Sequence, residues 1–280
     1  MNADTLRKLI CPNCGSPRLS NKALSVMESN CEGAVAEPLE CSACHSVYPC
    51  HDGIIDLSGS TITVPGKFSS QWAMEFQPLV ALYEHIWRPM VTRPFSDLNW
   101  EINTVQKLLE TTYGLDVLDL GCGPGNFTRL IAQTVKPGVV IGFDLSLPML
   151  KQGLRKLYKE NIPNIVLMRG DVTRWPFAKA SFDRIHCSGA LHLFPKLLQV
   201  FASIYNTLKP GGVFVGATYC RGGGFVKRKI QDYISAAHGF HWFELQELQS
   251  LAEESGLIGW QHFIKKQGIV FCVRKPEMAA

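Results

Sequence analysis

The chain has 280 residues, a formal net charge of +4, and 46% hydrophobic and 19% charged residues. This length suits one sizeable α/β core with a smaller appendage, and the composition is typical of a soluble globular protein. No apolar run approaches the ~20 residues that a bilayer span requires, so we expect no membrane-spanning segment. The mild charge falls short of the dense basic surface that indicates nucleic-acid binding.

We expect no targeting signal at the N-terminus of this sequence. Residues 1–10 contain no apolar core before Cys11, and they are too short and too acidic for a transit peptide. We therefore expect a cytoplasmic protein.

Ten cysteines are present, and four of them form two Cys-x-x-Cys pairs, Cys11/Cys14 and Cys41/Cys44. Each pair places two thiolates on one tight turn, and together they predict one tetrahedral, structural Zn²⁺. The 26 residues between the pairs exceed the usual ~15–20 of a zinc ribbon. Reduced thiols without metal are the alternative, and other side chains are possible substitute ligands: Cys31, His45, Cys50 and His51.

The stretch Tyr48-Pro49-Cys50-His51-Asp52-Gly53-Ile54-Ile55 resembles the Tyr-Pro-x-x-Asp-Gly-Ile-Pro ending of the small zinc-ribbon proteins that partner methyltransferases. We place a zinc-ribbon module at residues 1–58. The small and polar residues 59–66 that follow are typical of a linker.

Residues 67–114 are aromatic-rich and interrupted by prolines, which predicts a cap of several short helices. The last helix repeats Val105, Leu108, Leu109 and Tyr113 on one face, and it should pack against a sheet. Such aromatic stripes are more often core than pocket wall, and Trp72 and Tyr83 are only weak pocket candidates.

From residue 115 to the end, short apolar runs alternate with amphipathic segments, which predicts an α/β fold with a Rossmann-like, mostly parallel sheet and helices on both faces. The expected strands are Val117–Leu120, Val139–Phe143, Ile165–Met168, Arg184–Cys187, Val213–Thr218, Trp260–Ile264 and Ile269–Val273. Helices are expected from Phe127, around Met149–Leu157, Leu197–Leu208 and Leu245–Leu251, and a lid insertion at about 220–240.

A glycine-rich turn follows the first core strand, with Gly121, Gly123 and Gly125 spaced as Gly-x-Gly-x-Gly. Dinucleotide folds require Gly-x-Gly-x-x-Gly, so this spacing disfavours NAD. Asp144 ends the second strand about 20 residues later, where it can accept both hydroxyls of a ribose. Asp171 ends the third strand in position for an adenine amine.

With Leu208-Lys209-Pro210-Gly211-Gly212 added, the chain resembles the class I S-adenosylmethionine-dependent methyltransferases of the quinone-biosynthesis type. The resemblance implies the sheet order 3-2-1-4-5-7-6. It also implies a methionine site near Asp119 and the glycine loop, a ribose at Asp144, an adenine at Asp171, and Ser188 or Ala190 beneath the sulfonium. The cofactor set that follows is Asp119, Gly121, Cys122, Gly123, Gly125, Asp144, Leu145, Met149, Gly170, Asp171, Val172, Ser188 and Ala190.

The sulfonium of S-adenosylmethionine already activates its methyl group, so the protein mainly aligns the acceptor and excludes water. If a base is needed, His192 is the candidate, because the pKa of a histidine lies near the working pH. A merely pocket-lining His192 is an equal alternative, and His238 and His241 are fallback bases.

The sequence leaves three interpretations of the function open. The aromatic cap and modest charge favour a small apolar or aromatic metabolite. An rRNA base methyltransferase that uses the ribbon to recognise RNA is the second reading. The basic residues Arg221, Lys227, Arg228 and Lys229 are weak support for it, because a short charge run is usually a solvated helix face. A non-catalytic cofactor-binding partner is the third.

Overall fold

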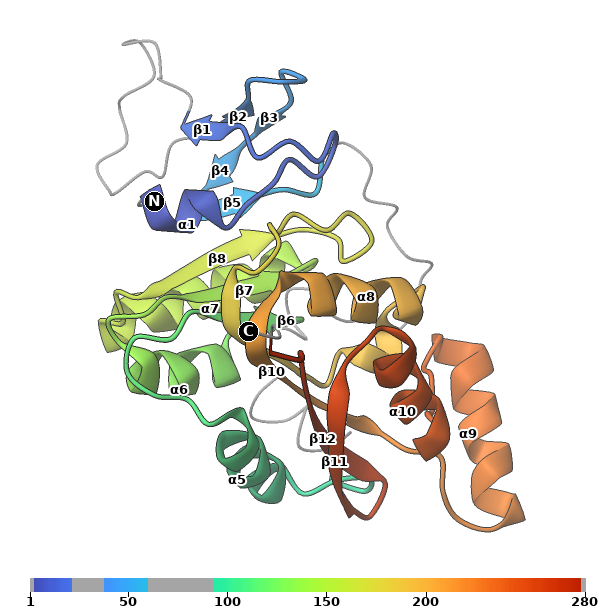
Figure 1. The fold of residues 1–280 in the computed structure, drawn as a ribbon. Coiled ribbons are helices and arrows are strands. Elements are labelled where there is room, and N and C mark those ends of the chain that lie inside the picture. Colours follow the sequence, from blue (N-terminus) through green and yellow to red (C-terminus); the bar gives the residue numbers. More distant parts are fainter. Residues whose placement is uncertain (1–2, 22–37, 60–92, 278–280) are drawn as a thin grey trace.

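The computed structural model describes residues 3–21, 38–59 and 93–277 (Figure 1). Several predictions lie outside these residues: those on Cys31, Trp72 and Tyr83, the linker beyond Gly59, and the cap before Arg93. Within the described part, no helix is long and apolar enough to cross a membrane.

The core is one sheet whose order confirms the prediction. Leaving out β5 (Ile54–Asp56) and β4 (Cys50–His51), which lie together at one edge, the order is β8-β7-β6-β9-β10-β12-β11, which is 3-2-1-4-5-7-6 in chain order of the predicted strands. All pairs from β8 to β10 are parallel, and β12 runs antiparallel to both of its neighbours. The strands are β6 (Val117–Leu120), β7 (Val140–Asp144), β8 (Ile165–Arg169), β9 (Phe182–Ser188), β10 (Leu208–Tyr219), β11 (Ile258–Lys265) and β12 (Gly268–Arg274).

Two strands from the N-terminal region extend this sheet from seven strands to nine. β5 (Ile54–Asp56) pairs in parallel with the edge strand β8, and β4 (Cys50–His51) pairs antiparallel with β5. All three residues of β5 are buried, so this short strand contributes core rather than a surface hairpin. Residues 50–56, which the sequence assigned to the module, are therefore continuous with the core sheet.

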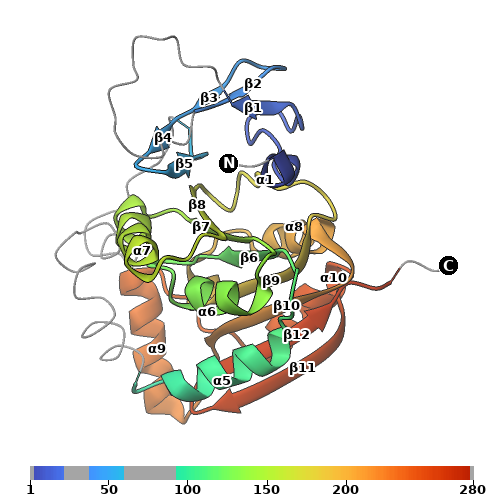
Figure 2. The same cartoon turned by 90° about the vertical axis from the view of Figure 1, so that its left-hand side faces the viewer.

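Helices cover both faces of the sheet, as predicted (Figure 2). α5 and α6 share one apolar cluster with β6 and β10, whereas α8 and α10 pack on the opposite face. The bounds are α5 (Leu98–Leu109), α6 (Asn126–Val135), α7 (Leu147–Glu160), α8 (Leu197–Thr207) and α10 (Leu245–Glu254). α5 packs against the sheet through Val105, Leu108 and Leu109, but the prediction for Tyr113 is wrong: α5 ends at Leu109, and Tyr113 is 79% exposed.

The insertion at 220–240 is a helix, α9 (Phe225–His238), which ends at Gly239 in the left-handed conformation. Within α9 only Gln231 is buried. Lys227, Arg228 and Lys229 lie on this helix, where Arg228 faces Glu244 and Lys229 lies over the ring of Phe225. Arg221 precedes the helix and pairs with Asp232. The three cations of α9 lie on an exposed helix surface, which agrees with the expectation that a short charge run is a solvated helix face.

A small antiparallel sheet forms the rest of the N-terminal module. It contains β1 (Leu19–Asn21), β2 (Leu39–Cys41) and β3 (Val47–Tyr48), and it is preceded by the short helix α1 (Ala3–Arg7). The module contacts the core a second time, where Leu9 forms an isolated antiparallel bridge with Phe177. The module is thus attached to the core through two separate segments of its chain.

Candidate functional site

The glycine-rich turn connects β6 to α6, and its backbone requires glycine. Gly121, Gly123 and Gly125 all have positive φ, between 53° and 75°. A Cβ on Gly121 would lie 2.3 Å from the Cβ of Ala190, so only glycine allows this loop to approach the loop after β9. A Cβ on Gly123 would meet no atom within 4 Å, so this backbone is open to a ligand.

Asp144 closes this turn from the end of β7. One carboxylate oxygen accepts the Gly123 N–H at 2.7 Å, and the other accepts the Ser146 N–H at 2.8 Å. Desolvation raises the pKa of the Asp144 carboxyl, and these two backbone donors oppose that shift. Since each carboxylate oxygen has a second lone pair, Asp144 retains the capacity to accept hydroxyls of a ribose.

A cavity lies between the glycine turn and the end of β9. Five predicted cofactor residues line it, namely Asp119, Gly121, Cys122, Gly123 and Ser188. Five further residues complete the lining: Pro124, Asn126, Phe127, His186 and Gly189. Cys122 is 8% exposed and burial raises the pKa of its thiol well above the ordinary range, so it contributes a neutral, packed side chain.

The remaining predicted cofactor residues lie around this cavity without lining it. Gly125 is the N-cap of α6, and Met149 is buried in the first turn of α7. The Leu145 carbonyl accepts a hydrogen bond from Arg169 Nε at 3.0 Å. Ala190 follows β9 and lies against Gly121, and Gly170, Asp171 and Val172 follow β8.

Asp171 forms a turn at the end of β8. One carboxylate oxygen accepts the Thr173 N–H at 2.8 Å, and the Asp171 carbonyl accepts the Arg174 N–H at 2.9 Å. Gly170 lies against Phe143, because an added Cβ would approach that ring to 2.4 Å. The turn thus holds the Asp171–Val172 backbone at the end of β8, beside Asp144.

The N-terminal module holds both ends of this turn. At one end, buried Asp56 pairs with Arg169 Nη1 at 3.0 Å, and the Leu57 N–H donates to the Arg169 carbonyl at 2.8 Å. At the other end, the Ile10 N–H donates to the Pro176 carbonyl at 2.8 Å. Ile10 directly precedes Cys11, so the two attachments connect the cysteine cluster to the segment between Arg169 and Pro176.

A buried hydrogen-bonded chain runs from β6 into the cavity. His186 Nδ1 lies 2.7 Å from Asp119 Oδ1, and His186 Nε2 lies 2.7 Å from Ser188 Oγ. Thr128 donates its hydroxyl to the second Asp119 oxygen at 2.5 Å. The register of the parallel pair β6–β9 sets Asp119 opposite His186, and the two-residue period of β9 puts His186 and Ser188 on one face.

His192 lies in a different environment, and the prediction that its pKa lies near the working pH is wrong. Burial, with a smaller contribution from His241, lowers the pKa of His192 to about 3. Its ring stacks on Phe240 at a centroid distance of 4.1 Å and meets the edge of Tyr219 at 5.4 Å. A neutral imidazole with so low a pKa is a weak general base at neutral pH. The fallback His241 is half exposed and hydrogen-bonds Glu247 at 2.8 Å.

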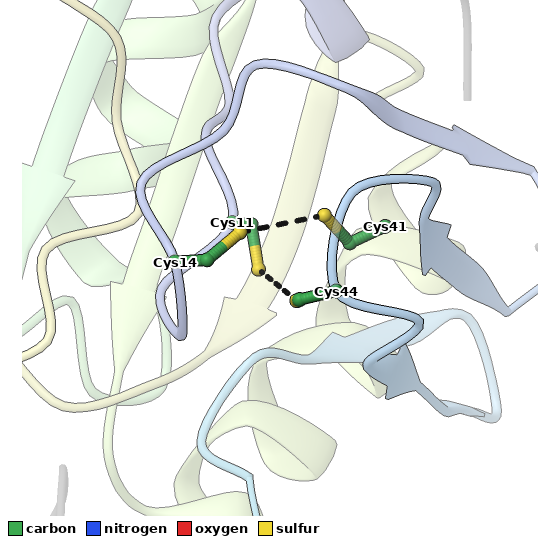
Figure 3. Close-up of side chains that lie close together, drawn as sticks. All are labelled: Cys11, Cys14, Cys41 and Cys44. Atoms are coloured by element: carbon green, nitrogen blue, oxygen red, sulfur yellow. Dashed lines mark hydrogen bonds between the residues drawn. The ribbon is translucent and has the colours of Figure 1, made fainter.

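The four predicted zinc ligands converge on one point (Figure 3). The sulfurs of Cys11, Cys14, Cys41 and Cys44 all lie within 4.8 Å of one another, with Cys11–Cys44 at 3.6 Å and Cys14–Cys41 at 3.7 Å. A tetrahedral Zn²⁺ with 2.3 Å bonds needs sulfurs about 3.8 Å apart, so this set fits the ion. Hydrogen bonds from Ser46 lower the pKa of Cys44 to about 5, which favours the thiolate that binds metal.

The two cysteine turns have the same backbone design. The Cys11 N–H donates to Ser16 and the Cys41 N–H donates to Ser46, five residues on in each case. Gly15 and His45 occupy equivalent left-handed positions, so His45 serves as a turn residue. Within residues 3–21, 38–59 and 93–277, the metal-ligating cluster contains the four cysteines alone, and the substitutes His45, Cys50 and His51 do not join it.

Comparison with known proteins gives the family. Residues 117–212 match the family described as "Methyltransferase domain". The Arabidopsis thaliana protein named "Uncharacterized methyltransferase At1g78140, chloroplastic" is 31% identical over 96% of this chain and 79% of its own length. The chain is a class I S-adenosylmethionine-dependent methyltransferase. A second Arabidopsis relative, named "Uncharacterized methyltransferase At2g41040, chloroplastic", is 28% identical over 95% of this methyltransferase and 77% of its own length.

Other matches to this methyltransferase cover less of its length. A Lactococcus lactis protein named "Demethylmenaquinone methyltransferase" is 39% identical over 40% of the chain and 45% of its own length. Among solved structures, Haemonchus contortus phosphoethanolamine N-methyltransferase 2 in complex with S-adenosyl-L-methionine superposes with a TM-score of 0.63. It is 16% identical over 82% of this chain and 62% of its own, a likeness of fold alone.

Sequence reasoning missed His186 as a residue of the methyltransferase site. The predicted strand Arg184–Cys187 contains His186 but stops one residue before Ser188; β9 continues to Ser188, and its two-residue period then places both side chains on one face.

Proposed function

We propose that this methyltransferase transfers a methyl group to oxygen or carbon of a small, aromatic or apolar metabolite. The observation that carries the proposal is an aromatic cluster beyond the carboxyl ends of β9 and β10. It consists of Phe95, His192, Tyr219, Phe240 and Trp242. His192 follows the cavity-lining Gly189 by three residues, so the cluster adjoins the proposed methyl donor site.

The cluster is closely packed and anchored by backbone hydrogen bonds. Phe240 and Trp242 lie 4.7 Å apart between centroids, and Phe95 meets Trp242 at 5.2 Å. The His241 N–H donates to the His192 carbonyl at 3.0 Å, which ties this segment to the loop after β9. Stacked and edge-on aromatic side chains of this kind bind planar apolar ligands well.

Two polar atoms inside the cluster suit an acceptor that carries oxygen. His192 Nδ1 and Trp242 Nε1 are buried without a hydrogen-bond partner in the described chain. A neutral imidazole offers a donor or an acceptor, and an indole N–H offers a donor. An aromatic ring with a hydroxyl or carbonyl substituent would satisfy both atoms. The demethylmenaquinone methyltransferase named among the relatives is compatible with that class of acceptor.

For the donor, we propose that S-adenosylmethionine occupies the cavity and extends along the ends of β7 and β8. Asp119, Gly121, Cys122, Gly123 and Gly125 would surround the methionine part, and Asp144, Leu145 and Met149 the ribose. Gly170, Asp171 and Val172 would hold the adenine, with Ser188 and Ala190 beneath the sulfonium. The open backbone at Gly123 and the spare lone pairs of Asp144 support this assignment.

We propose one structural Zn²⁺ held by Cys11, Cys14, Cys41 and Cys44. The ion would supply no chemistry to the transfer reaction, because the cysteine cluster belongs to the N-terminal module and not to the cavity lining. Elemental analysis is expected to give one zinc per chain. A zinc-free protein in which Cys41→Ser leaves β1–β3 folded would contradict this assignment.

Incubation with methyl-labelled S-adenosylmethionine and fractionated cell extract tests the acceptor directly. Label in an organic-soluble metabolite is the expected result, and label in RNA would replace the proposal with the rRNA reading. Binding of S-adenosylhomocysteine without transfer to any fraction would favour a non-catalytic partner. A cytoplasmic location remains a proposal, to be checked by fractionation, since the two Arabidopsis relatives are named as chloroplastic.

A further inference from the structure

The Asp119–His186–Ser188 chain is hydrogen-bonded throughout and largely buried. Both ring nitrogens of His186 have partners at 2.7 Å, and the side chains of His186 and Asp119 are 1% and 2% exposed. Phe127 packs on the imidazole at a centroid distance of 4.6 Å and shields it. Only the Ser188 end of the chain is less buried, and Ser188 lines the cavity.

The partners dictate the proton positions in this chain. A carboxylate only accepts hydrogen bonds, so a contact between Asp119 and His186 Nδ1 requires the hydrogen to be on Nδ1. In the neutral ring, Nε2 then carries a lone pair and accepts the hydroxyl hydrogen of Ser188. The Ser188 oxygen is left with lone pairs that face the cavity. This is the arrangement by which a carboxylate and a histidine together polarise a serine hydroxyl.

Ser188 is also placed where an acceptor can reach it. It is the last residue of β9, opposite Ala217 of β10, and Gly189 follows with φ of 69°. A Cβ on Gly189 would meet no atom within 4 Å, so the space beside Ser188 is open. The aromatic cluster begins at His192, three residues later. Ser188 therefore lies between the proposed donor and acceptor sites.

We propose that Ser188 Oγ, backed by His186 and Asp119, takes the proton that the methyl acceptor loses during transfer. The inference rests on the proposed function and narrows its substrate class to acceptors with a removable proton, namely hydroxyl compounds or carbon acids. Ser188 touches the acceptor and is the catalytic residue, whereas His186 and Asp119 act through it.

For a hydroxyl acceptor the step balances as follows. The acceptor oxygen forms a bond to the methyl carbon as the carbon–sulfur bond breaks, and sulfur keeps that electron pair. The acceptor proton passes to Ser188 Oγ while the Ser188 proton passes to His186 Nε2. The resulting imidazolium is stabilised by the Asp119 carboxylate, and its proton returns to solvent through Ser188 after the products leave.

The first test reads the tautomer and needs no acceptor. In nitrogen-15 NMR of histidine-labelled protein bound to S-adenosylhomocysteine, neutral His186 is expected to carry its proton on Nδ1. The Nε2 signal is expected to move in Ser188→Ala, because the hydrogen bond to that nitrogen is lost. A proton on Nε2 would make His186 a donor to Ser188, and that result would overturn the relay.

The second test separates chemistry from binding, using methyl-labelled S-adenosylmethionine and the extract fraction that the wild-type enzyme labels. Ser188→Ala is expected to lower turnover by about 10²-fold, far more than it lowers the affinity for S-adenosylhomocysteine. His186→Gln should fall similarly, and Ser188→Thr, which retains the hydroxyl, should recover part of the activity. Cys187→Ala is the matched control, because residue 187 lies between the two on the opposite face of β9 and should stay near wild-type turnover.

The outcomes separate the two proposals. A Ser188→Ala enzyme with wild-type turnover, or one whose loss equals its loss of S-adenosylhomocysteine affinity, overturns the relay alone. A wild-type protein that neither binds S-adenosylhomocysteine nor labels any fraction overturns the proposed function, and the relay with it.

Discussion

The carboxyl edge of the sheet has two halves that differ in how their polar groups are satisfied. At the ends of β7 and β8, both Asp144 oxygens accept backbone N–H groups, and Arg169 bonds Asp56 and the Leu145 carbonyl. Beyond the ends of β9 and β10, His192 Nδ1 and Trp242 Nε1 are buried and have no partner in the described chain. We call these regions the donor half and the acceptor half.

The difference suggests that the two halves recognise their ligands in different ways. Hydrogen bonds within the protein hold the donor half in one geometry before any ligand arrives, which lowers the ordering cost of binding a single invariant cofactor. Buried polar atoms without partners carry a desolvation cost that a suitable ligand relieves. The acceptor half therefore selects a ligand whose polar groups pair with its buried polar atoms. The donor half selects a ligand that fits its pre-formed geometry.

Removing the proposed zinc is expected to have the largest effect, and this effect falls on the donor half. Without the metal, the Cys11 and Cys41 turns would lose the ion proposed to join them, at a cost of several kcal/mol of module stability. Because Ile10 and Asp56 hold the ends of the Arg169–Pro176 segment, affinity for S-adenosylhomocysteine should fall with it. Scanning calorimetry before and after chelation measures the stability, and titration calorimetry measures the affinity for S-adenosylhomocysteine. If the metal-free protein binds S-adenosylhomocysteine with unchanged affinity, the donor half does not depend on the module.

Replacing Asp56 tests the same attachment with the metal in place. Asp56→Asn leaves the largely buried Arg169 guanidinium without its charge partner, at a cost of about 3 kcal/mol of stability. Affinity for S-adenosylhomocysteine should weaken about tenfold through the Leu145 and Asp171 loops. Asp52→Asn is the control, since Asp52 pairs with Lys151 of α7 at the surface. If Asp56→Asn and Asp52→Asn bind S-adenosylhomocysteine with the same affinity, the proposed link between the module and the donor half is contradicted.

His192 provides a pH test of the acceptor half. Its pKa is about 3 in the folded chain against an ordinary 6.5, so between these values the unfolded state binds a proton that the folded state does not. This contribution to stability is fully present above pH 6.5 and is lost as the pH falls toward 3, by about 2 kcal/mol at pH 5. The free energy of unfolding, measured with denaturant, should therefore fall less between pH 7 and pH 5 for His192→Phe than for the wild type. Parallel losses would mean that His192 is not buried as described.

The smallest expected effect is that of Trp242→Phe, which keeps the aromatic packing and removes only the buried indole N–H. If that group bonds an acceptor oxygen, KM for the labelled acceptor fraction should rise by up to about tenfold, as for one lost hydrogen bond. Affinity for S-adenosylhomocysteine should not change, because Trp242 is outside the donor half. A wild-type KM would remove Trp242 from acceptor recognition.

The sequence was sufficient for most of the core because its signals were local. The strand at Val117–Leu120 was predicted with the bounds observed. Five of the other six strands were predicted within two residues, whereas β10 begins at Leu208, five residues before the predicted start. The resemblance to known methyltransferases supplied the strand order. The four-cysteine cluster followed from the spacing within each turn, since two residues between cysteines bring both thiols to one side.

What the sequence did not reveal depends on contacts between distant segments. Ile54–Asp56 is only three residues long, and its pairing with β8 places it in the sheet across more than a hundred residues of chain. The Asp119–His186 contact likewise depends on the register of two strands. The pKa of His192 follows from burial against Tyr219 and Phe240, which a local reading does not indicate. These are the features on which the proposed chemistry depends.

The central claim is that the donor lies between the glycine turn and Ser188, with its ribose on Asp144. A crystal structure of the full chain with S-adenosylhomocysteine tests it most directly. We predict ligand in the cavity lined by Asp119, Gly123 and Ser188, both ribose hydroxyls on the Asp144 carboxylate, and the sulfur next to Ser188 Oγ. Ligand bound elsewhere, or a ribose that does not contact Asp144, would contradict this account.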